Sequence, residues 1–271
     1  MADVVVVTGV GGMGVACARR LGAGSHLVLA DFDQDKLGSV VDALAADGMT
    51  VTGQPVDVSD RSSVDALVDA VRAVGPLRTL VHTAGLSPTQ ASGARVLEVD
   101  MLGTDHVLNA FLDLVESGTV AVCIASMAGS MADLPREREQ ALTAATTDGL
   151  MDALGDMDLS DFGATYSVAK RVNQLRVERA AVTWGARGGR VVSISPGIIS
   201  TPMGRQELEE GSSEQMQGML AISPVPRIGT AEDIAAAAQW LASPAASFVS
   251  GCDLRVDGGV VAAVHGILAQ G

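Results

Sequence analysis

The chain contains a single tyrosine, Tyr166, which stands four positions before Lys170, one of only two lysines. If this stretch is a helix, residues four apart lie on the same face, so the phenol and the ammonium group can act together. A neighbouring cation favours the phenolate, which lowers the pKa of a tyrosine from its usual value of about 10. Such a tyrosine can pass a proton to or from an alcohol or carbonyl oxygen. A tyrosine and a lysine on an exposed helix would show the same spacing, so the surrounding elements have to decide.

Apolar segments with the pattern of buried strands alternate with helical segments along the chain. The first, 3–8, is a β-branched run without polar alternation, which is typical of a strand buried on both faces. The other expected strands are 26–31, 49–56, 78–83, 119–125, 190–195 and 253–257, and the expected helices are one ending near Gly22 and those at 34–46, 61–74, 94–116, 164–184 and 231–242. This alternation predicts an α/β fold of the Rossmann type, a doubly wound parallel sheet with helices on both faces, formed by residues 1–271 as a single domain.

The segment Gly9-Val10-Gly11-Gly12-Met13-Gly14 lies between the first expected strand and its helix and fits the pattern G-x-G-x-x-G. The first glycine permits a tight turn, the second lets a pyrophosphate approach the backbone, and the third lets helix and strand pack closely. The free N–H groups at the helix N-terminus then face the pyrophosphate. We therefore expect Gly9, Gly11, Gly12, Met13 and Gly14 to bind a dinucleotide.

Asp31 ends the second expected strand, which is the context that the glycine pattern needs. A carboxylate there accepts hydrogen bonds from the adenosine ribose and repels a 2′-phosphate. No cation stands beside it in the sequence, since its neighbours are Ala30, Phe32 and Asp33. The sequence therefore predicts NAD rather than NADP, with Asp31 and Phe32 in the cofactor site, although an aspartate that merely opens a turn would look the same.

The composition excludes several classes of function. A formal net charge of −14 argues against a nucleic-acid or anionic-membrane partner, because both need clustered cations. No apolar run is long enough to cross a bilayer, and the N-terminus shows no secretion signal, so we expect a cytoplasmic protein. Cys17, Cys123 and Cys252 lack metal-ligand spacing and are expected to be buried free thiols, and no metal site is predicted.

Motifs along nearly the whole chain resemble those of the short-chain dehydrogenase/reductase family. Ser126, in the segment 125–129, falls where the family keeps its catalytic serine, and Tyr166 and Lys170 match its YxxxK pair. Thr83-Ala84-Gly85 resembles the family's Asn-Asn-Ala-Gly strand end, with His82 and Thr83 in place of the asparagines. The glycine loop, one residue shorter than the commonest form, and the C-terminal segments 195–203, 227–235 and 250–259 follow in the family's order.

The resemblance implies hydride transfer between a secondary alcohol or ketone, as the small-molecule substrate, and a nicotinamide cofactor, for which the protein supplies orientation and electrostatics. Tyr166 is then the proton donor or acceptor, Lys170 binds the nicotinamide ribose, and Ser126 hydrogen-bonds the substrate oxygen. The further cofactor-binding residues that it implies are Asp57, Val58, Ala84, Gly85, Tyr166, Lys170, Pro196, Gly197, Ile199 and Thr201.

Two features depart from the family pattern. Asp100 stands where the family usually has an asparagine in a proton relay to the lysine, which makes it a candidate catalytic residue, although it would serve equally to pair with a cation or cap a turn. Ser126 and Tyr166 are further apart than is usual, and the extra residues 130–163 are consistent with an inserted pair of short helices. A similar insertion occurs in the branch resembling bacterial 3α-hydroxysteroid dehydrogenase/carbonyl reductase, where it alters subunit packing.

The segment 203–226 follows the Pro-Gly turn, where the family keeps its substrate lid. Methionine makes adaptable apolar walls, and the methionines expected around the mouth of the site are Met127, Met131, Met151, Met157, Met203, Met216 and Met219. We therefore expect a bulky apolar substrate such as a hydroxysteroid, although methionine is also an ordinary core residue. The apolar tail 260–264 is expected to be buried between the subunits of a homodimer or homotetramer.

Two other functions stay open. Epimerases and dehydratases of the same superfamily also use a YxxxK pair, but they usually carry a larger C-terminal domain for nucleotide sugars. A non-catalytic NAD(H) sensor is the second, and such proteins typically lose the tyrosine or the lysine, which this chain retains. Asp100 is the feature that leaves this second function open.

Overall fold

The computed structural model describes residues 2–87, 91–202, 204–205 and 213–269. In these ranges seven parallel strands form one sheet in the order β3-β2-β1-β4-β5-β6-β7. Their bounds are β1 Val4–Thr8, β2 His26–Asp31, β3 Thr50–Pro55, β4 Leu77–His82, β5 Val120–Ile124, β6 Arg190–Pro196 and β7 Asp253–Val256. The order reverses between β1 and β4, and ligands of open parallel sheets bind at the carboxyl ends of the strands beside such a reversal. The predicted doubly wound α/β fold is confirmed.

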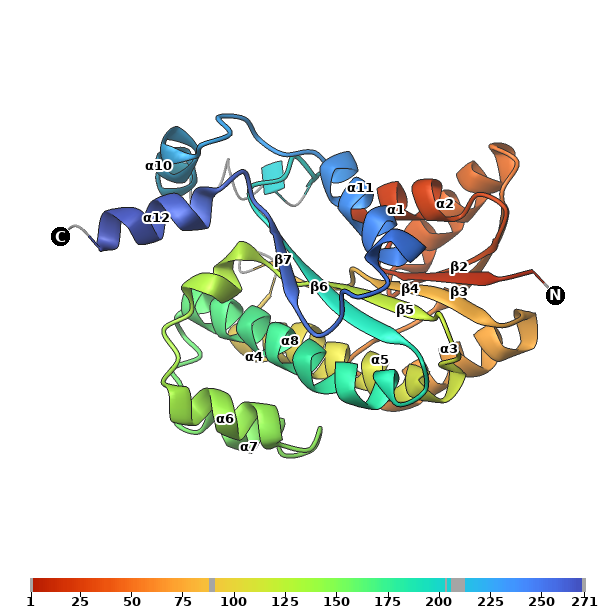
Figure 1. Cartoon of the computed structure of the whole chain (residues 1–271), viewed down its shortest axis with the longest axis horizontal. Coiled ribbons are helices and arrows are strands. Elements are labelled where there is room, and N and C mark those ends of the chain that lie inside the picture. The colour runs from red at the N-terminus through yellow and green to blue at the C-terminus, as the bar shows by residue number, and fades with distance from the viewer. Residues whose placement is uncertain (1, 88–90, 203, 206–212, 270–271) are drawn as a thin grey trace.

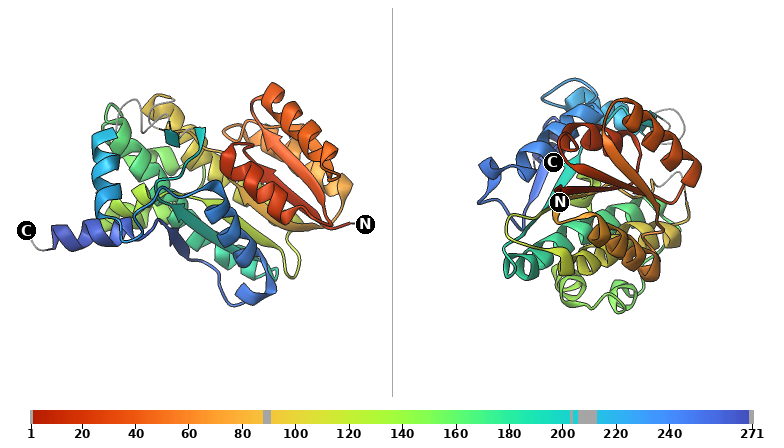
Figure 2. Two further views of the ribbon diagram at one scale, coloured as in Figure 1. Left: turned by 90° about the horizontal axis from the view of Figure 1, so that it is seen from above. Right: turned by 90° about the vertical axis from the view of Figure 1, so that its right-hand side faces the viewer.

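Helices cover both faces of the sheet (Figures 1 and 2). One face carries α1 Gly12–Leu21, α2 Gln34–Ala46 and α11 Ala231–Ala242, and the other carries α3 Arg61–Val74, α5 Gly103–Phe111 and α8 Phe162–Gly185. The five inner strands β2, β1, β4, β5 and β6 are apolar and mostly buried because each face packs on a helical layer, whereas the edge strands β3 and β7 are partly exposed. None of the helices in the described ranges combines the length and the apolar character needed to cross a bilayer.

The long helix expected at 94–116 is wrong as a single element. The chain forms α4 Gly93–Val96, a π-helical segment η1 Leu97–Leu102, then α5, and a 3-10 turn η2 Leu112–Leu114. Gly103 N–H donates to Glu98 O, five residues back, and this wider turn contains Asp100. Such single-turn π-segments inside helices are frequent at functional sites.

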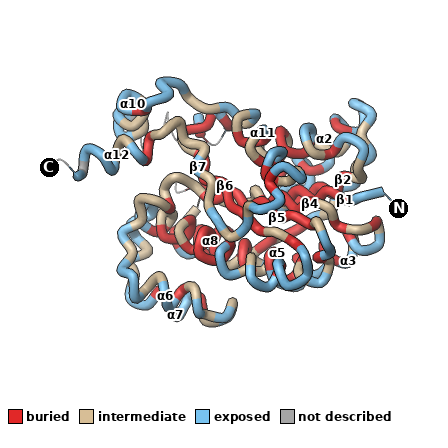
Figure 3. Tube along the Cα trace, viewed as in Figure 1, coloured by how far each residue is buried: buried red, intermediate tan, exposed pale blue. Residues whose placement is uncertain are grey.

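Residues 130–163 include two short helices, α6 Arg136–Ala144 and α7 Leu150–Leu154. Their inward side chains Leu142, Leu150 and Leu154 are buried in a cluster with residues of η1 and α8. Their outward faces are exposed (Figure 3). The segment is therefore a packed addition to the outside of α8.

Beyond β7 the chain continues as α12 Val260–Leu268, in which Val260 and Val261 are buried and Ala262 is exposed, so burial of the tail between subunits stays a prediction. One expectation for the C-terminal part is wrong. Cys252 is exposed because it lies in the surface loop before β7, whereas Cys17 and Cys123 are buried as expected. Of the expected lid, α10 Ser213–Ile222 is described, whereas Met203 and 206–212 lie outside the described residues.

Candidate active site

The glycine loop joins β1 to α1 with very little space for side chains. Gly9 has φ +86°, and a Cβ placed on it would lie 2.6 Å from the backbone nitrogen of Ala84. A Cβ on Gly14 would overlap Gly9 O. Both positions therefore require glycine, the first for its backbone conformation and the second for the close approach of helix and strand.

A cavity of about 890 Å³ opens beside this loop. It lies at the carboxyl ends of β1, β2, β3 and β4, and Thr201 and Pro202 line it from across the glycine loop. The predicted cofactor residues that line it are Gly9, Gly11, Gly12, Met13, Gly14, Asp31, Phe32, Asp57, Val58, Ala84, Gly85 and Thr201. Its volume is in the range of ligand sites, and its glycine-rich wall leaves the backbone open to a pyrophosphate. The residues present therefore fit a dinucleotide.

Asp31 is held firmly at the wall of this cavity. Its Oδ2 accepts a hydrogen bond from Val10 N at 2.6 Å, and its Oδ1 accepts one from Asp33 N at 3.0 Å. The structure also brings Lys36 to the same cavity, because α2 begins directly after the turn and its first turn faces the opening. Lys36 is five positions after Asp31 in the sequence, so the residues adjacent to Asp31 do not reveal this cation.

Asp57 lies at the far end of the cavity in contact with Arg95, which the sequence did not single out. Arg95 Nη2 is 3.1 Å from Asp57 Oδ2, and Ser59 donates to Asp57 Oδ1 through its backbone and its hydroxyl. Burial raises the pKa of Asp57, but the hydrogen bonds from Ser59 and Arg95 outweigh it and hold that pKa below its usual value. This part of the cavity wall thus carries an ionised carboxylate beside a cation.

Tyr166 and Lys170 lie together on α8, as their spacing predicts. The helix begins after Asp161, whose side chain accepts a hydrogen bond from Ala164 N. Lys170 Nζ is 5.4 Å from the centre of the Tyr166 ring, and Lys170 is buried. A cation so close to a phenol supports the proton-transfer chemistry expected of the pair.

Asp100 forms a direct ion pair with Lys170. Asp100 Oδ2 lies 2.9 Å from Lys170 Nζ, and Asp100 Oδ1 accepts a hydrogen bond from Leu86 N at 2.7 Å. Both side chains are shielded from solvent. Burial raises the pKa of Asp100, an effect that Lys170 and Leu86 N oppose. Gly85, in the wall of the cavity, packs directly against this pair, since a Cβ on it would lie 3.1 Å from Lys170 Nζ.

His82 lies behind the ion pair in a buried chain of hydrogen bonds. Its Nδ1 is 2.7 Å from Thr8 Oγ1 and its Nε2 is 3.1 Å from Thr104 Oγ1. Because the Thr104 hydroxyl donates to Asp100 O, it must accept from Nε2, so the imidazole is neutral with its proton on Nε2. Burial, aided by the charge of Lys170, lowers the pKa of His82 to about 3.

Ser126 caps a short 3-10 helix, η3 Met127–Met131, that packs on α8. Its Oγ accepts a hydrogen bond from Ala128 N at 3.2 Å, which leaves the hydroxyl proton available for another partner. The contact between η3 and α8 occurs at Gly129, where a Cβ would lie 2.9 Å from the backbone of Lys170 and Arg171. A glycine at this position thus lets the serine segment rest on the backbone of the helix that carries Tyr166 and Lys170.

The remaining predicted cofactor residues are elsewhere. Gly197 and Ile199 line a second cavity of about 480 Å³, together with residues of α10, of the segment 223–229 and of the chain around β7. Pro196 is the last residue of β6. Among the described residues, these three are absent from the lining of the larger cavity, and so are Ser126, Tyr166 and Lys170.

Comparisons with known proteins agree with this fold over nearly the whole chain. A family model described as enoyl-(acyl carrier protein) reductase matches residues 9–261. The short-chain dehydrogenase/reductase bsc3 of Alternaria brassicicola is 34% identical over 261 residues, which cover 95% of each protein.

Solved structures show the same likeness. A short-chain type dehydrogenase/reductase from Mycobacterium ulcerans is 29% identical with a TM-score of 0.77, covering 96% of this chain and 90% of that one. A 7α-hydroxysteroid dehydrogenase in complex with NADH and 7-oxo glycochenodeoxycholic acid is 26% identical with a TM-score of 0.76, covering 95% of this chain and 93% of that one. The chain belongs to the short-chain dehydrogenase/reductase family, whose members are oxidoreductases that bind nicotinamide cofactors.

Proposed function

We propose that the protein is a cytoplasmic, NAD-dependent oxidoreductase that interconverts a secondary alcohol and a ketone at Ser126, Tyr166 and Lys170. The observation that carries the proposal is the approach of Lys170 Nζ to the Tyr166 ring at 5.4 Å, with Lys170 packed against Gly85, a residue that lines the glycine-rich cavity. The bound nicotinamide supplies the acceptor or donor of the hydride.

In the direction of oxidation, the Ser126 hydroxyl donates a hydrogen bond to the substrate oxygen and fixes its position. The phenolate of Tyr166 would take the proton from the alcohol, and a nicotinamide bound in the cavity would supply the acceptor for the hydride of the carbinol carbon, which would leave a ketone. The charge of Lys170 favours the phenolate in the resting enzyme. Reduction of a ketone runs through the same groups in reverse.

The preference for NAD rests on Asp31. Its carboxylate is oriented by two backbone N–H groups and lines the cavity, where it can accept hydrogen bonds from ribose hydroxyls. A 2′-phosphate would meet this charge, although Lys36 in the same wall offers it a cation. We give Asp31 more weight than Lys36 in proposing NAD, because these hydrogen bonds orient Asp31, whereas the Lys36 side chain is on the exposed surface of α2.

The substrate is proposed to be bulky and apolar, such as a hydroxysteroid. The second cavity has apolar walls that include Ile198, Ile199, Leu220 and Val225. Met157 and Tyr166 both pack against the apolar cluster under α6 and α7. The relative solved with 7-oxo glycochenodeoxycholic acid supports this class of substrate.

We propose a homodimer as the assembly. Helices α6 and α7 cover part of the outer surface of α8 (Figure 1), a surface that would otherwise be open to a second copy. The exposed part of α12 remains available for contact between subunits. Light scattering after size-exclusion chromatography tests this, and a tetramer would contradict it.

The function is tested by NADH formation from NAD and a panel of secondary alcohols that includes hydroxysteroids, with wild type and Tyr166→Phe assayed together. We expect turnover by wild type and a loss of at least about 100-fold in the variant, since a positioned acid–base group contributes about 10²–10⁴-fold. Retained NADH binding by the variant serves as the control for folding. Binding of NADH without turnover of any alcohol by wild type would favour the sensor function instead.

A further inference from the structure

We propose that Asp100 is a positioning residue that sets the pH range of Tyr166 by neutralising the charge of Lys170. The consequence for catalysis rests on the proposed function, whereas the effect on the ionisation of Tyr166 depends only on the three side chains. Asp100 acts through Lys170, while Lys170 in turn acts on the phenol of Tyr166.

The Lys170 ammonium group is close to both of the other side chains. Its Nζ is 2.9 Å from Asp100 Oδ2 and 5.4 Å from the centre of the Tyr166 ring. The Asp100 and Lys170 side chains are 0% and 6% exposed, so solvent screens their interaction only weakly. An ammonium group paired in this way presents a smaller net field to the phenol than an unpaired one.

The carboxylate is held where it cannot turn away from the lysine. The Leu86 N–H fixes Oδ1, and the Thr104 hydroxyl holds the backbone carbonyl of Asp100 within the π-helical turn. An asparagine in the same place keeps an oxygen for Leu86 N and nearly the same volume, but it replaces the charged oxygen that faces Lys170 with an uncharged NH2 group. The substitution Asp100→Asn therefore removes the ion pair with little change of shape.

The other titratable groups around the pair do not replace its charge. On the same face of the sheet, β4 contributes His82, which is neutral in its hydrogen-bonded chain, and β5 contributes Cys123, whose pKa burial raises to about 12. Tyr166 itself is the group that α8 contributes beside Lys170. Asp100 is thus an anion in direct contact with the lysine.

Because Tyr166 is the only tyrosine, its ionisation can be followed directly by the ultraviolet absorption of the phenolate. The experiment is a pH titration of wild type, Asp100→Asn, Lys170→Met and the double variant, with Tyr166→Phe as the spectral blank. Circular dichroism at each pH identifies the range in which each protein is folded. The measurement needs neither substrate nor cofactor.

We expect the phenolate midpoint of Asp100→Asn to lie about one pH unit below that of wild type, and that of Lys170→Met to lie above it. In the Lys170→Met background the Asp100 substitution should have no such effect, because the lysine charge that it unmasks is gone. The same downward shift is expected in the lower limb of the pH profile of kcat/KM for alcohol oxidation.

An unchanged midpoint in Asp100→Asn, or a downward shift that persists without Lys170, would overturn the proposal. If alkaline unfolding precedes the midpoint, the kcat/KM profile decides by the same criterion. Absence of turnover in wild type would defeat the proposed function, whereas the absorption titration would still report on the coupling of the three side chains. The two failures are therefore distinguishable.

Discussion

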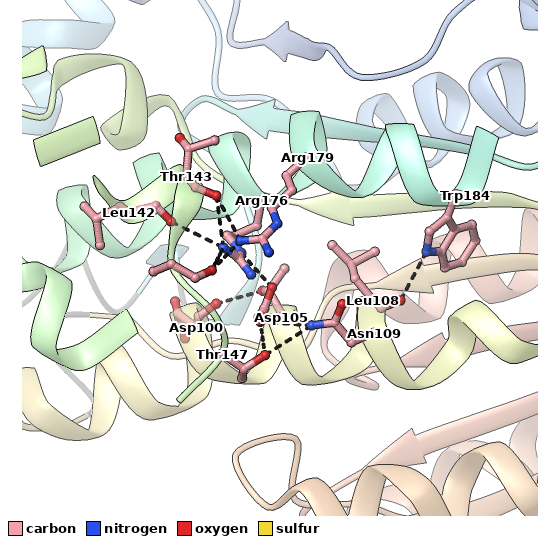
Figure 4. A network of polar contacts seen from close by, with 12 residues as sticks. Asp100, Asp105, Leu108, Asn109, Leu142, Thr143, Thr147, Arg176, Arg179 and Trp184 are labelled. Carbon is pink, nitrogen blue, oxygen red and sulfur yellow. Dashed lines mark hydrogen bonds and ion pairs between the residues drawn. The ribbon is translucent and has the colours of Figure 1, made fainter. Parts of the chain in front are cut away.

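Arg176 Nε lies 2.6 Å from Asp105 Oδ1, and both side chains are almost completely buried. Arg176 also donates to backbone carbonyls at the C-terminal end of α6, including Ala145 O at 2.8 Å (Figure 4). Asp105 accepts hydrogen bonds from Thr147 and Asn109. This network joins the added helix α6 to α5, which follows directly after the η1 segment with Asp100, and to α8, which carries Lys170.

Removing the charge of Asp105 should destabilise the whole domain. In Asp105→Asn the Arg176 guanidinium stays buried without its counter-ion, and breaking one side of such a pair costs about 3–5 kcal/mol. Urea unfolding followed by circular dichroism measures the change. The matched control is Asp113→Asn, which breaks the exposed pair between Asp113 and Arg187 and should cost at most about 1 kcal/mol. Equal effects of the two substitutions would contradict the structural role of the buried network.

Gly129→Ala should lower both activity and stability. The added Cβ would meet the α8 backbone at 2.9 Å, so η3 must move away from the helix and carry Ser126 with it. Overpacking of this kind costs about 1–3 kcal/mol. The control is Gly185→Ala, at the end of the same helix, where a Cβ meets nothing within 4 Å and stability should be unchanged or slightly higher. Unfolding by urea and kcat/KM for the best alcohol are the two measurements, and full activity in Gly129→Ala would show that Ser126 tolerates the shift.

Asp31→Asn should reduce the discrimination between the two nicotinamide cofactors. Losing a hydrogen bond to a charged group costs about 1.5–3 kcal/mol, so we expect NADH to bind about 10- to 100-fold more weakly. NADPH should be less affected, because the substitution also removes a repulsion. Dissociation constants from the quenching of tryptophan fluorescence check both values, with Lys36→Met as the companion variant that should weaken NADPH alone. Equal affinity of wild type for the two cofactors would refute the assignment of Asp31.

His82 should make the protein sensitive to mild acid. Its pKa is lowered from 6.5 to about 3 in the folded state, so the unfolded chain binds a proton over this range while the native state does not. Stability is therefore greatest above about pH 6.5 and falls as the pH decreases, by about 2 kcal/mol between pH 7 and 5. His82→Gln should be less stable at pH 7, but its urea midpoint should depend less on pH in this window. An identical slope in both proteins would assign the acid sensitivity to other groups.

Local sequence patterns were sufficient for the fold and for the cofactor cavity. The inner strands are short apolar runs that alternate with helical segments, so all seven strands were predicted to within a few residues, although the helix expected at 94–116 is divided. The glycine loop was predictable because the turn after the first strand requires glycine, as the positive φ of Gly9 shows. The family resemblance rested on the same short motifs and is confirmed. The catalytic roles of Ser126, Tyr166 and Lys170 stay predictions.

Other features depend on contacts between residues that are distant in the sequence. The sequence around Asp100 was compatible with a proton relay, an ion pair or a cap. In the folded chain η1 packs on α8, and Asp100 forms an ion pair with Lys170. The same packing brings Arg176 to Asp105 and His82 to Thr104, and the chain path after the second strand brings Lys36 into the cavity. A periodic pattern reports which face of an element is buried, but the partner of a buried charge follows only from how two elements are docked. For that reason the strands, most helices and the glycine loop could be predicted from the sequence, whereas the charged groups around Tyr166 could be identified only from the tertiary structure.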